Sequence, residues 1–289
     1  NQSSGFHTTV GTISWACGNT FGVNMPLGAD YLVNHNARAA TTFPVISCYH
    51  TKEVKIENIT VQGNKIKNSY LNGCRGAGIF LFQSHGTELR NCKIIDYRGD
   101  GISFQQSNSV LVENCISSGN THLGLHPGSG SKNPSILNCK SMDNGRIGLF
   151  LCWRVKNGHF ENNDLIRNSD SGVSIGHKDT DNLFRSNRIN DNGKEGILFR
   201  DESEPMGGHR NRFEKNEILN NGKKVEGYGV RILGETHDLT FIENHIGNDT
   251  KGKQQVGVYI NEKASNITLR NNDISGNLNQ NIKDERREA

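Results

Sequence analysis

The sequence has little of the material from which a conventional globular core is built. Only 33% of its 289 residues are hydrophobic, and it contains 5 prolines, 2 tryptophans and 12 phenylalanines. No run of apolar residues is long enough for a membrane-spanning helix. Without a pattern, such a composition would indicate disorder. An ordered fold is therefore expected only if a repeat lets a few buried residues in each unit suffice.

An excess of charge of either sign is also missing. The chain has 33 Lys and Arg against 30 Asp and Glu, a formal net charge of +3. No run of basic residues is interleaved with aromatic residues, so we expect no nucleic-acid partner. No signal peptide is visible, and the chain begins at Asn1 rather than Met, as a processed or trimmed form would.

The cysteines lack the spacing of a metal or redox motif. There are 7, without a Cys-x-x-Cys pair or a zinc pattern. Cys92, Cys115 and Cys139 occupy equivalent positions in consecutive repeats, so we expect a stack of small buried thiols. A disulfide between two adjacent coils is the alternative and would need suitable Cβ geometry. The cysteines do not identify the redox compartment.

What the sequence does contain is a repeat built around Asn and Cys. Equivalent frames such as Glu113-Asn114-Cys115 and Lys215-Asn216-Glu217 recur along the chain. The equivalent positions are Asn58, Cys92, Cys115, Cys139, Asn163, Asn187, Asn216, Asn244 and Asn272. From Cys92 on, subtraction gives spacings of 23, 24, 24, 24, 29, 28 and 28. A period of this size indicates stacked repeats, in which each Asn amide bonds to the Asn above and below.

A second stripe has the same period. Each repeat carries a Gly followed by apolar residues at alternating positions, as in Gly172-Val173-Ser174-Ile175, which is typical of a strand with one buried face. These glycines are Gly78, Gly101, Gly124, Gly148, Gly172, Gly196, Gly229 and Gly257. The repeats leave no room for a helix, which excludes an alternating helix–strand sheet. The fold class is therefore predicted to be an all-β parallel solenoid with an Asn/Cys ladder.

The repeat also predicts the domain organisation. Residues 45–277 should form one solenoid, because the period is unbroken across them. Residues 1–44 do not show the ladder and should form irregular first coils or a cap, and residues 278–289 should form a C-terminal cap or tail. A solenoid end needs such a cover because it exposes unpaired strand edges.

These features resemble the right-handed parallel β-helix of the pectin lyase-like superfamily. The resemblance covers roughly residues 45–277 and implies a single-stranded right-handed parallel β-helix. That superfamily includes polysaccharide lyases, glycoside hydrolases, uronate epimerases and phage tailspikes. Its members imply a polysaccharide partner and a secreted or cell-surface location.

A local resemblance is to mannuronan C5-epimerases. Their segment Tyr-Gly-Phe-Asp-Pro-His, followed by a ladder frame and Asp-Asn-Gly, is similar to Leu123–Gly128 followed by Asn138-Cys139 and Asp143-Asn144-Gly145. Here Leu123 stands at the family's Tyr position, His126 at its Asp position and Gly128 at its His position.

Alignment of the coils on their glycines predicts where chemistry is located. Neighbouring coils place outward side chains about 4.8 Å apart, so residues distant in sequence can act together. The central coils are the richest in His, Arg, Asp and Trp at such positions. We predict catalytic roles for His122, His126, Arg146, Asp170 and His177 and substrate-binding roles for Trp153, Arg154, Lys178, Arg200, Asp201 and Arg231.

These residue types suit acid–base chemistry on a sugar acid. Removing the proton alpha to a carboxylate needs a base, for which His126 or His177 is available, and a cation such as Arg146 that neutralises the carboxylate. Trp153 offers an apolar face for a sugar ring. Hydrolysis would instead need two carboxyl groups, and Asp170 with Asp201 are the candidates, with Asp100 as a third.

Each candidate also has a purely structural interpretation. The column His122, Arg146, Asp170 and Lys194 would then be a solvated set of charges that contributes little. Asp179, Asp181 and Asp249 offer oxygen ligands for calcium, but no EF-hand or glycine-rich nonapeptide accompanies them. We therefore expect no cofactor, with calcium as the one alternative.

Two functions are open as hypotheses. The first is a carbohydrate-active enzyme, either a lyase or epimerase acting on a uronate-containing glycan or a glycoside hydrolase. The second is a non-catalytic glycan-binding or structural β-helix, such as a tailspike or adhesin module, in which outward Phe80, Phe82 and Phe150 form a subunit interface. The assembly would be a monomer in the first case and a homotrimer in the second.

Overall fold

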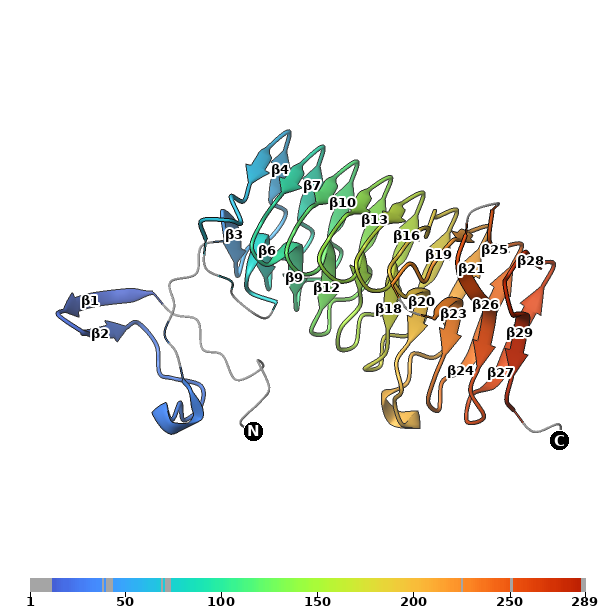
Figure 1. Ribbon diagram of the computed structural model, residues 1–289. Coiled ribbons are helices and arrows are strands. Elements are labelled where there is room, and N and C mark those ends of the chain that lie inside the picture. Colours follow the sequence, from blue (N-terminus) through green and yellow to red (C-terminus); the bar gives the residue numbers. More distant parts are fainter. Residues whose placement is uncertain are drawn as a thin grey trace.

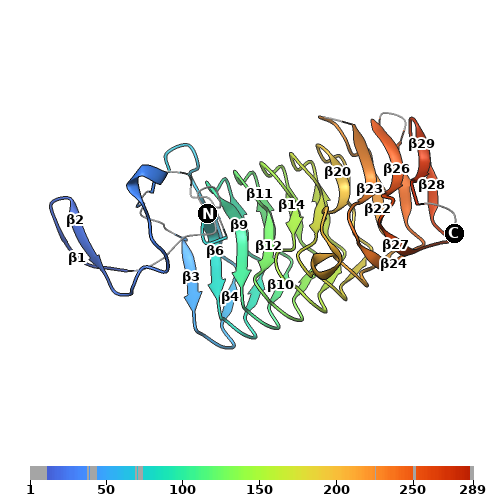
Figure 2. The same ribbon diagram turned by 90° about the horizontal axis from the view of Figure 1, so that it is seen from below.

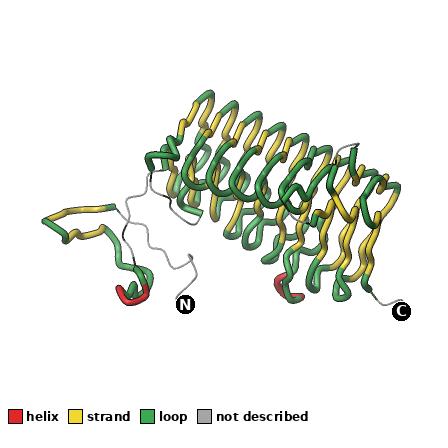
Figure 3. The backbone as a smooth tube through the Cα atoms, in the orientation of Figure 1, coloured by secondary structure: helices red, strands yellow, loops and turns green. Residues whose placement is uncertain are grey.

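The chain winds into a parallel β-solenoid, whose successive coils are stacked along one axis (Figure 1). The computed structural model describes residues 12–37, 39, 44–68, 70, 74–224, 226–249 and 252–286. Parallel pairing of each strand with its equivalent in the next coil confirms the predicted all-β solenoid fold. The described helices are two short 3₁₀ turns, η1 (Val33–His35) and η2 (Glu204–Met206), visible as the red segments of Figure 3. Neither of these helices is long and apolar enough to cross a membrane.

The first sheet has ten strands, which follow one another along the solenoid (Figure 2), and the predicted site residues lie on these strands or near their ends. In chain order its strands are β3 (Ile46–Tyr49), β6 (Ala77–Phe82), β9 (Asp100–Gln105), β12 (Leu125–Gly128), β15 (Leu149–Phe150), β18 (Val173–Ile175), β20 (Glu195–Phe199), β23 (Gly227–Ile232), β26 (Gln254–Ile260) and β29 (Gln280–Asp284).

Two further sheets close each coil. The second has nine strands: β4 (Lys55–Glu57), β7 (Glu88–Arg90), β10 (Leu111–Glu113), β13 (Ser135–Leu137), β16 (His159–Glu161), β19 (Leu183–Arg185), β21 (Arg212–Glu214), β24 (His237–Ile242) and β27 (Ser265–Arg270). The third comprises β5 (Thr60–Gln62), β8 (Lys93–Ile95), β11 (Ile116–Ser118), β14 (Lys140–Met142), β17 (Asp164–Ile166), β22 (Glu217–Leu219), β25 (His245–Gly247) and β28 (Asp273–Ser275). Single bridges at Arg188 join its two parts.

The ends of the chain differ from the repeat. Near the N-terminus, β1 (Ile13–Cys17) and β2 (Thr20–Val23) form a separate antiparallel hairpin, apart from the stack in Figure 1, in which all side chains of β1 are exposed. Residues 1–11, 38 and 40–43 of the predicted N-terminal region lie outside the described residues. At the other end β29 pairs in parallel with β26, so strands of the first sheet continue past residue 277, the predicted boundary.

The predicted ladder runs through the interior. The side-chain amide of Asn163 donates to Asn187 at 2.9 Å, and Asn187, Asn216 and Asn244 each donate to the next Asn at 2.9 Å. Each amide also donates to a backbone carbonyl, as Asn187 does to Phe160 at 3.0 Å. Buried amides tolerate this position because all of their polar groups are paired.

The same ladder explains the Asn-Asn doublets. The residue before each ladder position has a left-handed backbone, with φ of 54° at Asn138, 56° at Asn162 and 53° at Asn271. Asn adopts this conformation more readily than most residues. The first Asn therefore makes the turn and the second enters the ladder.

The expectation for Asn58 was wrong by one residue. Asn58 is exposed, has a φ of 58° and accepts a hydrogen bond from Asn91 at 3.2 Å. It occupies the turn position, and Ile59 occupies the ladder position level with Cys92, whose neighbour Lys93 donates to the Ile59 carbonyl at 2.8 Å. A single Asn followed by an apolar residue fits either position by pattern alone.

A second ladder was not predicted. It runs along another corner, where the side-chain amide of Asn120 donates to Asn144 at 2.9 Å and Asn144 donates to Asn168 at 3.0 Å. Its later members are Asn192, Asn221, Gln254 and Asn277. The stripe glycines make room for it, because a Cβ on Gly124 would lie 2.6 Å from Nδ2 of Asn144.

Inward side chains form one continuous core. Phe160, Phe184, Phe213 and Phe241 stack at centroid distances of 4.7, 4.6 and 4.7 Å. All seven cysteines are free, and Cys92, Cys115 and Cys139 form the predicted buried stack. The Cys139 amide donates to the Asn163 side chain at 2.8 Å, so the thiols continue the ladder.

Candidate functional site

The site is located on the outer surface of the ten-stranded sheet. Strand pairing places His126 on β12 level with Ser103 on β9, and the ring of His126 contacts Phe150 on β15 at 5.2 Å. Phe80, expected to be exposed on this face, is instead only 1% exposed and packs against Tyr49. It therefore does not offer the subunit interface that its outward position predicted.

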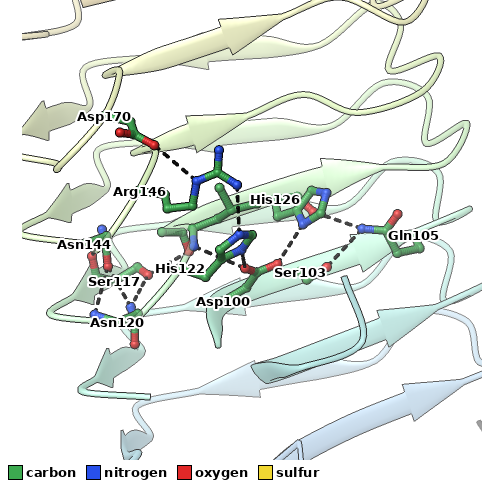
Figure 4. Close-up of polar contacts among 12 residues, drawn as sticks. Asp100, Ser103, Gln105, Ser117, Asn120, His122, His126, Asn144, Arg146 and Asp170 are labelled. Carbon is green, nitrogen blue, oxygen red and sulfur yellow. Dashed lines mark hydrogen bonds and ion pairs between the residues drawn. The ribbon is translucent and has the colours of Figure 1, made fainter. Parts of the chain in front are cut away.

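Asp100 joins two histidines of the next coil (Figure 4). Its Oδ1 lies 2.7 Å from Nδ1 of His122, and its Oδ2 lies 2.7 Å from Nδ1 of His126. The backbone amide of Leu123 also donates to Oδ1 at 3.1 Å. Asp100 is 1% exposed, so these three donors replace the water that its carboxylate loses on burial.

The contacts determine which nitrogens carry protons. A carboxylate can only accept, so each histidine donates from Nδ1. Arg146 donates to Nε2 of His122 at 3.2 Å, and that nitrogen must therefore be an acceptor. In neutral His126 the lone pair is likewise on Nε2, which is buried and has no hydrogen-bond partner among the described residues. A buried, unpaired imidazole nitrogen of this kind can take a proton from a bound molecule.

The electrostatics keep Asp100 ionised. Burial favours a higher pKa for its carboxyl, but the hydrogen bonds from His122 and His126 outweigh it, and the pKa is lowered. Tyr70 also lies at this site, with its ring 6.2 Å from that of His122. Burial and the charge of Asp100 raise the pKa of the Tyr70 phenol.

The column that begins at His122 is an alternating set of charges. Asp170 accepts from Arg146 at 3.1 Å and from Lys194 at 3.0 Å. Burial raises the pKa of Asp170, but the two cations outweigh it and the pKa is lowered. The side chain of Arg146 is 52% exposed, so it retains donors for a ligand while it contacts His122.

A second cluster forms around Arg200, immediately after β20. Its guanidinium donates to Ser174 at 2.8 Å and to the buried carboxylate of Asp179 at 3.3 Å, and lies 4.8 Å from the centre of the Phe150 ring. His177 lies beside it, with Nδ1 3.4 Å from Arg200. Phe150 therefore separates His126 from Arg200 on the same face.

Burial dominates the titration of this cluster. It raises the pKa of Asp179 to about 7, although Arg200 and two backbone amides oppose the rise. Burial and the charge of Arg200 lower the pKa of His177 to about 4. His177 is thus neutral at pH 7, and its Nε2–H donates a hydrogen bond to the Glu202 carboxylate at 2.9 Å.

The remaining predicted binding residues lie at the edge of this cluster. The rings of Trp153 and His177 are tilted by 33° with their centroids 5.4 Å apart, and Arg154 lies 5.8 Å from the Trp153 ring. Lys178 and Asp201 are exposed. Asp179 and Asp181, two of the three calcium candidates, bond to Arg200 and Arg210 respectively.

The predicted pair of hydrolytic carboxyls is not brought together. Asp170 precedes β18 and Asp201 follows β20, so they lie at opposite ends of two paired strands. The 5 residues of β20 span about 16 Å, whereas two carboxyls that cleave a glycosidic bond lie roughly 5–9.5 Å apart.

Comparison with protein families gives a match over most of the chain. The family model described as "Periplasmic copper-binding protein (NosD)" matches residues 35–253. The chain belongs to the NosD family. A comparison with curated proteins gives no match.

Solved structures with this fold include alginate-modifying enzymes. The NosD-family chain is similar to a periplasmic alginate epimerase, AlgG, with a TM-score of 0.56, 14% identity and coverage of 68% of this chain and 47% of that one. An alginate lyase from Paenibacillus sp. str. FPU-7 gives 0.55, 12% identity and coverage of 72% and 76%. The A-module of the Azotobacter vinelandii mannuronan C-5 epimerase AlgE6 gives 0.53, 12% identity and coverage of 83% and 75%.

These similarities confirm the parallel β-helix fold. The NosD-family chain spans about half the length of the AlgG structure that it matches. The proteins to which it is similar in structure act on a polysaccharide, as their names state.

Arg231, predicted from its column, lies on β23 of the same face. Its guanidinium lies 4.6 Å from the Tyr228 ring centre and 5.9 Å from that of Tyr259. One nitrogen lies 3.4 Å from buried Glu195, which also accepts from Ser171 at 2.7 Å. The NosD-family chain thus carries a second polar cluster, four strands from His126 in the sheet order.

Glu204, His209 and His237 are the described residues that come closest to a metal-ligand set. His209 and His237 stack face to face at 3.6 Å. Both ring nitrogens of His209 have backbone partners: Nε2 lies 2.7 Å from the Glu204 carbonyl, and Nδ1 accepts from the His237 amide at 3.1 Å. No lone pair of His209 is left for a ligand bond.

The partner of His126 was not recognised from the sequence. The sequence indicated Asp100 only as a third carboxyl for hydrolysis. Asp100 lies one residue before its stripe glycine, Gly101, whereas His122 and His126 lie two residues from theirs, Gly124, so the three residues do not fall in one column. Buried Asp179 and Glu195 were missed as partners of Arg200 and Arg231. A column of residues directly before each stripe glycine would have drawn attention to Asp100 and Glu195.

Proposed function

We propose that this protein acts on a uronate-containing polysaccharide by removing the proton alpha to the sugar carboxylate, as a lyase or C5-epimerase does. The observation that carries the proposal is Nε2 of His126, which is buried and unpaired among the described residues while Asp100 holds Nδ1. A buried carboxylate that orients an imidazole and stabilises its protonated form makes a good general base.

Each residue of the site then has a role. His126 takes the C5 proton, and its new positive charge is balanced by Asp100. Arg146 and Arg200, on either side of Phe150, supply cations for the carboxylate as negative charge develops on it. Phe150 offers its half-buried ring to the apolar face of the sugar.

The two reactions diverge once the C5 proton has been removed. In a lyase the C4–oxygen bond breaks as the C4–C5 double bond forms, and the proton on His126 passes to the leaving oxygen. In an epimerase C5 receives a proton on its opposite face from a second acid. Tyr70, near His122, is the candidate for that acid.

The comparisons support this proposal at the level of the substrate class. Similar structures belong to enzymes named for alginate, a uronate polymer. The description of the family includes the word periplasmic, which supports a location outside the cytoplasm. A glycoside hydrolase is less favoured because Asp170 and Asp201 lie at opposite ends of their strands.

The family description also names copper, and the described residues do not fit it. The stacked rings of His209 and His237 cannot both direct a nitrogen lone pair at one ion, and His209 has none to spare. The thiols of Cys92, Cys115 and Cys139 point into the core and bond to backbone carbonyls. We therefore assign no step to a metal.

The test is turnover by His126 variants. The protein is incubated with a panel of uronate polysaccharides, with absorbance recording unsaturated product and NMR in D₂O recording exchange at C5. We expect His126→Asn to lower the rate at least 100-fold, a loss typical of a missing general base, and Asp100→Asn to lower it by a similar factor.

His159→Asn is the matched control, since His159 lies on β16 of another sheet and contacts Glu161. It should keep the rate of the parent protein. A His126→Asn variant that turns over as fast as the parent would overturn the assignment. Binding of the glycans without any turnover would instead favour the non-catalytic β-helix.

A further inference from the structure

We infer that Tyr228, Arg231, Glu195 and Tyr259 form a second binding site on this face, which holds a carboxylate-bearing sugar several residues away from the one that reacts. The inference rests on the proposed function for its ligand class. It makes the further claim that the protein recognises a chain of acidic sugars rather than a single unit.

The first argument is the state of Arg231. Its Nε is buried and has no hydrogen-bond partner among the described residues. Of its donors, one makes a long contact of 3.4 Å with Glu195, and the side chain is still 36% exposed. A guanidinium that only stabilised the fold would be paired more fully, as Arg185 is with Glu214 at 2.9 Å.

The second argument is the aromatic surroundings. Tyr228 and Tyr259 meet edge to face at 5.8 Å, and both rings lie within cation–π distance of Arg231. Tyr259 is half-buried, so it presents part of its ring to solvent. Aromatic rings beside a planar donor suit a pyranose that carries a carboxylate, because the ring packs and the acid pairs with Arg231.

The third argument is charge. Beyond Tyr228, which is hydrogen bonded to Glu226, the ends of β23 and β26 border an open hollow of about 630 Å³. Lys223, Lys224 and Lys253 line it, and of these only Lys223 has an ion-pair partner among the described residues. Glu226 also lines the hollow, so Lys224 and Lys253 outnumber its one carboxylate and leave this end of the face with a small positive excess, which attracts an acidic chain.

The spacing connects the two sites. From β12 to β23 there are four strand steps, β12–β15–β18–β20–β23, or roughly 19 Å at the usual strand separation. We take each sugar of an extended chain to advance by about one strand spacing, about 4.8 Å, so about five sugars reach from His126 to Arg231. Half-buried Leu198 and Phe150 lie between the two sites in the sheet order.

The experiment compares a short and a long oligouronate as ligands of the whole protein. Arg231→Met keeps the apolar stem over Tyr228 and removes the donors. With an octameric oligouronate we expect it to raise KM and the Kd about tenfold and to leave kcat unchanged, since the lost contact is remote from the reacting bond. With a trimer, which is too short to reach Arg231, KM and Kd should stay within twofold of the parent.

Two controls separate recognition from folding. Arg185→Met removes a cation from another sheet and should leave octamer binding unchanged. A carboxyl-reduced, neutral octamer should bind parent and Arg231→Met equally. Thermal unfolding of each variant reports a purely structural role, which would lower the midpoint without altering octamer affinity and would overturn the inference.

Other outcomes also decide the question. Equal loss for trimer and octamer, or equal loss for the neutral octamer, would contradict a distant carboxylate site. If the parent turns over uronates and His126→Asn does not, while Arg231→Met leaves KM and Kd for the octamer unchanged, the inference fails and the proposed function stands. If the parent neither binds nor turns over any acidic oligomer, both fail.

Discussion

Asp100 illustrates what a single residue decides in this protein. A buried carboxylate is costly unless donors surround it, and here both nearby imidazoles supply one at 2.7 Å. Because the buried carboxylate needs a donor, it also fixes the proton of His126 on Nδ1 and thereby defines its tautomer. Asp179 is governed by the same opposing effects, but there burial outweighs the charge of Arg200 and the pKa of Asp179 rises to about 7.

The Asp179 and His177 side chains have opposite effects on the stability of the folded protein as the pH changes. Asp179 has a folded pKa raised to about 7, so its contribution to stability is present below about pH 4 and is lost as pH rises towards 7. His177 has a folded pKa lowered to about 4, so its contribution is present above about pH 6.5 and is lost as pH falls towards 4.

Single variants should reveal these two opposite dependences of stability on pH. Between about pH 4.5 and 6.5, Asp179→Asn should gain stability relative to the parent as pH rises, and His177→Gln should lose it, each by about 1–2 kcal/mol. Urea unfolding at a series of pH values measures both. Exposed Asp201→Asn is the control, and slopes of the same sign for the two variants would contradict the assignment.

At the scale of the element, a coil is defined by its corners rather than by its strands. Most strands of the second and third sheets are three residues long, too short to be stable alone. The corners supply the specificity: a left-handed residue turns the chain, and the next residue bonds into the ladder. This division of labour makes neighbouring positions respond very differently to the same substitution.

A matched pair of substitutions tests the corner. Asn187→Ala removes the acceptor for two donors of Asn163 and the donor to Phe160, so we expect a loss of about 3 kcal/mol in the free energy of unfolding. Asn114 is an exposed turn residue with φ of 54° and one amide contact of 3.4 Å. Asn114→Ala should cost about 1 kcal/mol, and Asn114→Gly should remove that cost.

Denaturant unfolding measures all three variants. Equal losses for Asn187→Ala and Asn114→Ala would show that the two corner positions are energetically alike, contrary to the hydrogen-bond pattern.

At the scale of the whole molecule, stability is distributed along one axis. The strands of each coil pair only with those of the neighbouring coils, so the stack behaves as a chain of similar interfaces. The central coils have a neighbour on both sides, whereas β29 has one and all of its side chains are exposed. Protection should therefore decline towards the C-terminal end.

Hydrogen exchange measures that decline. Amides paired within β16 and β19 should exchange at least about 100-fold more slowly than those of β28 and β29. The measurement follows peptides from both regions in one sample. Uniform exchange along the stack would indicate a single cooperative unit instead of a linear array.

Particular residues show how far pattern analysis reaches. The ladder from Cys92 to Asn272 was predicted, because period and residue type coincide in every coil. Asn58 was misplaced and the ladder through Asn144 was missed, because Asn suits a left-handed turn and a buried ladder equally. His126 was selected, but its partner Asp100 lies at a different offset in the preceding coil.

By itself the sequence determined the architecture, since a period of 23 to 29 residues with two recurrent stripes is compatible only with stacked parallel coils. It also determined which residue types face outward on the central coils. Only the tertiary structure decided which of them meet, separating Asp170 from Asp201 and joining Asp100 to His122 and His126. The reason is physical: a period sets the level of a residue on the stack, while burial and hydrogen-bond geometry set which neighbour its side chain reaches.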